Sequence, residues 1–95
     1  MTNEITLDYK PQSRSDVLLR ELDDGCVLYE PKLENIHSMN STAAYIWTLC
    51  DSDHSVEDII EMVKYDYREF TAEPEIEVKQ IIQRFHDLGL LQTTS

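Results

Sequence analysis

The feature that most constrains this sequence is a turn signal between two short apolar segments. Residues 17–22 and 26–29 are rich in apolar side chains, and Asp23, Asp24 and Gly25 separate them. An Asp-Gly step in this setting is typical of a β-hairpin, because these residues accept the backbone angles of a tight turn. Residues 35–39 form a further extended segment after Pro31, which cannot donate to a strand ladder. The sequence therefore predicts three antiparallel strands.

After the third strand the apolar residues recur at helical spacing. Asn40 is placed to cap a first helix, and the spacing from Ser55 to Asp58 is that of a capping box at the start of a second. Pro74 and Gly89 are start and stop signals for a third. The expected helices are residues 41–50, 55–67 and 73–88.

Three strands followed by three helices predict an α+β fold in which a three-stranded antiparallel sheet packs on a three-helix bundle. The second and third helices form a helix-turn-helix pair, and the hairpin added to it makes a winged-helix-type module. The length of 95 residues suits one domain. We expect residues 1–16 to be a flexible N-terminal arm, residues 17–91 the domain, and residues 92–95 a tail.

The charge balance excludes several classes of partner. The chain has 19 acidic and 8 basic residues, for a formal net charge of -11. Nucleic acid and anionic membrane surfaces repel such a protein, because their binding relies on Lys and Arg. The expected third helix carries more acidic than basic residues, so a DNA-binding regulator is a remote alternative. The N-terminus lacks the pattern of a secretory signal, which predicts a cytoplasmic protein without a membrane segment.

No catalytic arrangement is recognisable in the sequence. His37, His54 and His86 fall on separate elements, and no Cys or His spacing suggests a metal site. Cys50 precedes His54 closely but lies on an apolar stripe, where a thiol is usually inert packing. The sequence Asp51-Ser52-Asp53 does not match an acyl carrier protein, in which a leucine follows the serine. We expect no catalytic residue, no metal, no cofactor, and two reduced cysteines.

A binding module remains, with the strand at residues 35–39 as its free edge. An edge strand beside an apolar helix can accept an extended peptide as one more strand. A small subunit that docks on a larger enzyme is the alternative from the same features. An edge strand next to a mobile arm also allows either a monomer or a strand-swapped dimer.

Four stretches resemble the PqqD-like family: residues 24–29, 36–51, 55–59 and 88–91. The resemblance implies a non-catalytic peptide chaperone, or recognition element, for ribosomally made and modified peptides. Such a protein binds the leader of a precursor peptide as an added strand. It then presents the peptide to a modifying enzyme, such as a radical SAM maturase or a leader peptidase.

The resemblance also implies the binding residues. The strand edge supplies Asn35, Ile36, His37, Ser38 and Met39, and the third helix supplies a wall drawn from Val78, Lys79, Ile82 and Phe85. The helix offers two flanks: Ile82 and Lys79 lie on one side of its apolar stripe, and Ile81 and Arg84 on the other. The sequence leaves open which flank faces the peptide.

Overall fold

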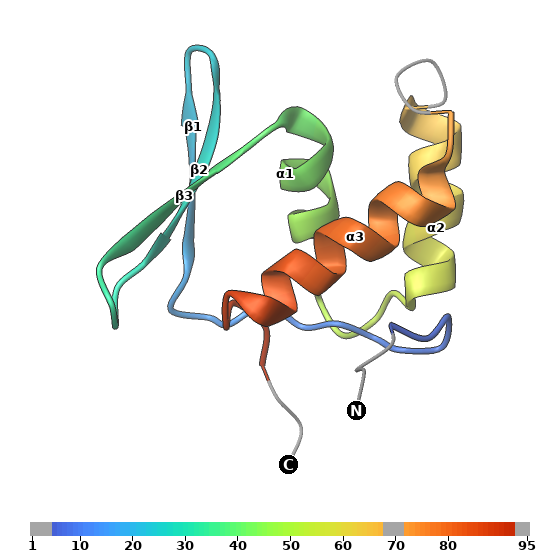
Figure 1. Cartoon of the computed structure of the whole chain (residues 1–95), viewed down its shortest axis with the longest axis horizontal. Coiled ribbons are helices and arrows are strands. Elements are labelled where there is room, and N and C mark those ends of the chain that lie inside the picture. Colours follow the sequence, from blue (N-terminus) through green and yellow to red (C-terminus); the bar gives the residue numbers. More distant parts are fainter. Residues whose placement is uncertain (1–4, 68–71, 93–95) are drawn as a thin grey trace.

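The chain folds into three strands followed by three helices (Figure 1). The computed structural model describes residues 5–67 and 72–92. The predicted α+β order is confirmed, and each end lies within two residues of its expected position. The elements are β1 (Leu18–Leu22), β2 (Gly25–Glu30), β3 (Asn35–Met39), α1 (Ser41–Thr48), α2 (Val56–Tyr67) and α3 (Pro74–Asp87).

The strands form one antiparallel sheet in the order β1-β2-β3, so β1 and β3 are its edges. The predicted hairpin joins β1 to β2, with Asp23 and Asp24 as its two-residue loop. Gly25 differs from the expectation, because it pairs with Leu22 as the first residue of β2. Its backbone packs closely: a β-carbon there would lie 3.5 Å from the carbonyl oxygen of Met39.

The two faces of the sheet have different surroundings. Leu28 in the centre of β2 is fully buried, and Met39 at the end of β3 is buried as well. The helices lie on this side of the sheet (Figure 1). On the other face, Leu18, Tyr29 and Ile36 form a row across the three strands, and Leu18 and Ile36 are exposed.

Local signals in the sequence account for the helix ends. The Asn40 side chain accepts a hydrogen bond from the Ala43 N–H at 2.8 Å, which caps α1. Ser55 and Asp58 form the reciprocal bonds of a capping box at 3.0 and 3.1 Å. Gly89, with φ of 74°, lies just beyond the end of α3 in the left-handed region that glycine tolerates.

The core lies between the helices and the inner face of the sheet. The rings of Trp47 and Phe85 meet edge to face, with centroids 5.2 Å apart and an interplanar angle of 84°. Val78, Ile82 and Phe85 face this core from α3 and are fully buried. The apolar stripe of α3 is therefore its core-facing side.

The expectation of a flexible arm over residues 1–16 does not hold for residues 7–14. The carbonyl of Tyr9 accepts a hydrogen bond from the N–H of Val56 at 2.8 Å, and the N–H of Ser13 donates to Cys50 at 2.8 Å. Pro11 is fully buried. The segment is held by isolated backbone bonds, which need no apolar period in the sequence, and this explains why the pattern missed it.

The termini lie partly outside the described residues. Residues 1–4 of the expected arm and 93–95 of the expected tail are among those the structure does not describe. Gln92 is described, and its N–H donates to the carbonyl of Gln12 at 2.7 Å. No helix in the described part of the chain is long and apolar enough to cross a bilayer.

Candidate functional site

The free edge of β3 presents backbone groups that the sheet does not use. A two-residue hairpin closes on a hydrogen-bonded pair, so the backbones of Leu22 and Gly25 bond to each other. Along an antiparallel ladder, hydrogen-bonded pairs alternate with pairs that are not bonded. Counting along β2, Leu28 then bonds to His37 of β3. The N–H and C=O of Ile36 and Ser38 therefore point away from the sheet, toward the open edge.

The side chains of the five β3 residues divide between the two faces. Asn35 and Ser38 are exposed, and Ile36 is 65% exposed on the outer face. His37 is half-buried on the inner face, and its Nε2 atom has no hydrogen-bond partner among the described residues. Met39 is buried. The β3 edge thus offers the backbone groups of Ile36 and Ser38, whereas the unpartnered ring nitrogen of His37 is itself buried.

The predicted helical wall needs correction. Val78, Ile82 and Phe85 are all 0% exposed, so their side chains belong to the core and present no surface to a ligand. The apolar periodicity that predicted the helix marks the side of the helix that faces the core. A peptide groove must therefore use residues beside this apolar stripe.

An open cleft lies between α3 and the start of α1, and we call it the α1–α3 cleft. It has a volume of about 570 Å³. Asn40 follows β3 directly and contributes to its lining, together with Ala43 of α1. Ile81 and Arg84 line it from α3, so this flank of the helix faces β3 and α1. The remaining lining residues are Ala72, Glu73, Ile76, Glu77 and Gln80.

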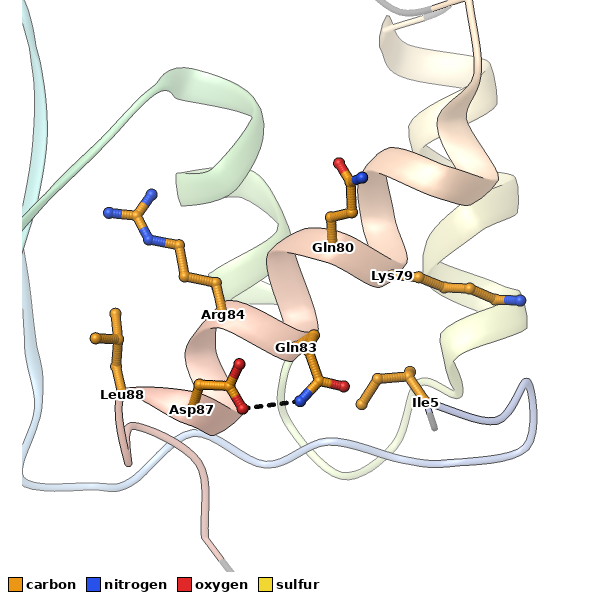
Figure 2. A pocket seen from close by; sticks show the side chains of 7 residues that line it. All are labelled: Ile5, Lys79, Gln80, Gln83, Arg84, Asp87 and Leu88. Carbon is orange, nitrogen blue, oxygen red and sulfur yellow. Dashed lines mark hydrogen bonds between the residues drawn. The ribbon is translucent and has the colours of Figure 1, made fainter. Parts of the chain in front are cut away.

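Lys79 lies on the other flank of α3. It lines a second hollow with Ile5, and its ammonium group lies 3.4 Å from the Glu75 carboxylate. Figure 2 shows Lys79 directed toward α2, whereas Arg84 extends in the opposite direction, toward the sheet. Gln83 and Asp87 share a hydrogen bond of 2.9 Å in the same hollow. The structure therefore separates Lys79 from the β3 residues with which it was predicted to act.

The residues missed at the sequence level follow a readable pattern. Glu73, Glu77, Gln80 and Arg84 succeed one another at helical spacing, next to the buried stripe of α3. That spacing predicts one continuous edge of the helix. Periodicity alone does not distinguish this edge of the helix from the edge that carries Lys79.

Arg14 fixes how α3 lies relative to the sheet. Its guanidinium group donates to the carbonyl oxygen of Gly89 at 2.9 Å and to the carboxylate of Glu30 at 2.8 Å. Glu30 pairs with Asn35 in the sheet. The C-terminal end of α3 is thereby tied to the end of the sheet where β3 begins. Asn40, just after the end of β3, lies nearer the start of α3, because it shares the cleft with Glu73 and Glu77.

The buried carboxylate of Glu30 stays ionised because its surroundings donate to it. Burial acts to raise the pKa of Glu30, but the N–H groups of Leu33 and Lys32 and the Arg14 guanidinium outweigh it together. The pKa of Glu30 is therefore lowered. Through Arg14 and Glu30, the N-terminal segment, β2 and the end of α3 meet at one charged junction.

Among the described residues, the remaining reactive side chains are not arranged as a catalytic group. Burial, with a smaller effect of the Asp51 charge, raises the pKa of the Cys50 thiol to about 12. His54 is bonded to the carboxylate of Asp51 at 3.0 Å, at the surface. Within residues 5–67 and 72–92, no three His, Cys, Asp or Glu side chains are placed to share a metal ion.

An antiparallel three-stranded sheet with an open edge strand, backed by three helices, defines a small α+β domain. The model of one family, coenzyme PQQ synthesis protein D (PqqD), matches residues 25–91. The match spans more than half of the chain, so the chain belongs to the PqqD family. The matched region begins at the start of β2, whereas the sequence predicts that the domain starts at residue 17.

Two solved structures share this fold. A lasso peptide synthetase B1 complexed with the leader peptide has a TM-score of 0.74 at 19% identity, covering 90% of this chain and 100% of that one. TbiB1 in complex with the TbiA(beta) leader peptide has a TM-score of 0.71 at 17% identity, covering 88% and 98%. No curated protein sequence matches the chain.

Proposed function

We propose that this chain binds the leader segment of a ribosomally made precursor peptide as a fourth strand on the edge of β3. It acts in the cytoplasm as a non-catalytic partner and presents the bound peptide to a modifying enzyme, such as a radical SAM maturase or a leader peptidase. The observation that carries this proposal is the edge itself: the backbone groups of Ile36 and Ser38 point outward, next to the α1–α3 cleft.

The family and the neighbours support a leader peptide as the ligand. The two similar structures were both solved with leader peptides, and an added strand is a common way for a sheet edge to bind an extended chain. A disordered leader loses conformational entropy when it binds. A dissociation constant near 1 μM, about -8 kcal/mol, would still permit release to the enzyme.

The proposed contacts come from β3 and from the flank of α3 that faces it. The edge provides Asn35 to Ser38, of which Ile36 and Ser38 present their backbone groups outward. Ile81 offers a half-buried apolar surface in the cleft, and Ile76 is 50% exposed beside it. Lys79 stands outside this site, and Val78, Ile82, Phe85 and Met39 support it from the core.

A matched pair of proline variants tests the proposal. Ile36→Pro removes an outward N–H from β3 without breaking a bond to β2, and Glu21→Pro does the same on the opposite edge, at β1. The probe is a labelled leader peptide from a short open reading frame beside this gene. We expect Ile36→Pro to lose binding of the leader peptide, whereas Glu21→Pro and Ile36→Ala should retain it. Equal binding by both proline variants contradicts the proposal.

A docking subunit that binds no peptide is the second candidate. The row of Leu18, Tyr29 and Ile36 on the outer face of the sheet favours it, since Leu18 and Ile36 are exposed and apolar surface of this kind is typical of contact sites. Titration of the isolated chain distinguishes the two functions. A docking subunit shows no peptide binding until its enzyme is added.

A further inference from the structure

The α1–α3 cleft carries opposite charges at its two ends. Glu73 and Glu77 line it toward the start of α3, and Arg84 lines it toward the end. Within residues 5–67 and 72–92, none of these three side chains forms an ion pair, whereas Glu75 and Lys79 on the other flank pair with each other at 3.4 Å. The charges in the cleft are thus available to a bound chain.

From this arrangement we infer that the cleft selects peptides by the order of their charges: a basic residue first, then an acidic residue further toward the C-terminus. The inference rests on the proposed function and deepens it, because it defines the chemical class of leader that fits.

The direction of the peptide follows from the sheet and from Arg14. All pairs in the sheet are antiparallel, so a strand added in the same manner runs opposite to β3. The end of α3 lies beside the start of β3, through the bonds of Arg14 to Gly89 and Glu30. A peptide antiparallel to β3 therefore runs along α3 in the direction of the helix. Its earlier residues meet Glu73 and Glu77, and its later residues meet Arg84.

The spacing of the two peptide charges can be calculated from element geometry. Seven helical steps separate Glu77 from Arg84, or about 10 Å at about 1.5 Å per residue. Eleven steps separate Glu73 from Arg84, or about 16 Å. An extended strand advances about 3.3 Å per residue. The basic and acidic residues of a matching peptide are thus about three to five positions apart.

The net charge of the chain alone would give a different preference. An excess of acid attracts basic peptides irrespective of where their charges lie. Arg84 changes this, because it favours an acidic residue at one end of the cleft only. The order of the charges, and not their sum, is the property that the geometry predicts.

Selection from a peptide library tests the inference without knowledge of the natural leader. A displayed library of random 12-residue peptides is selected on the full chain and on two double variants. E77K/R84E reverses two of the three cleft charges and leaves Glu73 in place. E75K/K79E reverses an equal pair of charges on the opposite flank of the same helix and serves as the matched control. Thermal melts of all three proteins confirm that they are folded.

The expected result is enrichment of peptides with Lys or Arg about three to five positions before Asp or Glu. The E77K/R84E variant should enrich the reverse order, and E75K/K79E should behave like the parent. Synthetic peptides with the two orders should differ in affinity by about two- to thirtyfold, the range for two exposed ion pairs.

Two outcomes would overturn the inference in distinguishable ways. Binders that are lost in Ile36→Pro but show no charge order would leave edge binding intact and refute charge selection. A selection that yields no binders sensitive to Ile36→Pro would refute the proposed function and charge selection together.

Discussion

Arg14 reaches Glu30 with a distance of 2.8 Å between its Nη2 atom and the Oε1 atom of the carboxylate, and so joins the N-terminal segment to the sheet. The side chain of Glu30 is 2% exposed. The same guanidinium also bonds Asp16 and the carbonyl of Gly89 at the end of α3. This junction holds α3 and β3 in the relative orientation on which the peptide direction depends.

Removal of Arg14 should destabilise the fold in a pH-dependent way. Arg14→Met leaves the buried Glu30 carboxylate without its cation, which is costly, and we expect Tm at pH 7 to fall by more than about 5 °C. The pKa of Glu30 is lowered, so the stability from this carboxylate is complete above its ordinary value of 4.5 and is lost as the pH falls. The Tm difference should therefore shrink between pH 7 and pH 3.

Glu30→Gln is the control for that measurement, because it keeps the shape of the side chain but cannot ionise. A Tm difference between parent and Arg14→Met that is equal at pH 7 and pH 3 would show that the charge of Glu30 plays no part.

Phe85 should behave as a core residue and not as the wall of a groove. Phe85→Ala is expected to lower the free energy of unfolding by about 3–5 kcal/mol, because it leaves a cavity against Trp47. Arg84→Ala, one residue earlier and exposed, should change it by less than about 0.5 kcal/mol. Denaturant titration followed by Trp47 fluorescence measures both. A small cost for Phe85→Ala would place its side chain at the surface.

The two cysteines should differ sharply in reactivity. Cys50 is buried and its pKa is raised to about 12, so at pH 8 it holds roughly 1,000-fold less thiolate than a thiol of pKa 9.0. Cys26 is only partly buried. We expect iodoacetamide to label Cys26 in the folded chain and Cys50 only after unfolding, as mapped by mass spectrometry. Rapid labelling of Cys50 in folded Cys26→Ser would contradict this.

His54 should titrate above its ordinary value of 6.5. The side-chain hydrogen bond to Asp51 raises the pKa of His54, against a smaller effect of desolvation. Its contribution to stability is complete below pH 6.5 and is lost as the pH rises through the raised pKa. NMR titration of the ring should give a midpoint that falls in Asp51→Asn but not in Glu57→Gln. An unchanged midpoint in Asp51→Asn would exclude the pair.

The fold was predictable because its signals are local. Asn40 and the Ser55–Asp58 pair cap their helices as the sequence predicts. Gly89 ends α3 in the left-handed conformation. Each of these features depends on residues within a few positions of one another, and local hydrogen bonds decide them.

The site was predictable only in part, because its walls depend on packing between distant segments. The edge strand at Asn35–Met39 was found from its pattern and its place before a helix. The role of Arg14 depends on Gly89, 75 residues away in the sequence. The flank of α3 that faces β3 depends on how the helix lies against the sheet, since Lys79 and Arg84 are equally plausible by periodicity.

The exchange rates of the Ile36 and Ser38 amides test the central proposal most directly. Both N–H groups point to the open edge of β3, so they should exchange quickly in the free chain. On saturation with a leader peptide, hydrogen exchange measured by NMR should show both amides protected, while the amides of Leu19 and Glu21 on the opposite edge stay unchanged. Saturated binding with Ile36 and Ser38 still exchanging at the free rate would show that the peptide does not add to this edge.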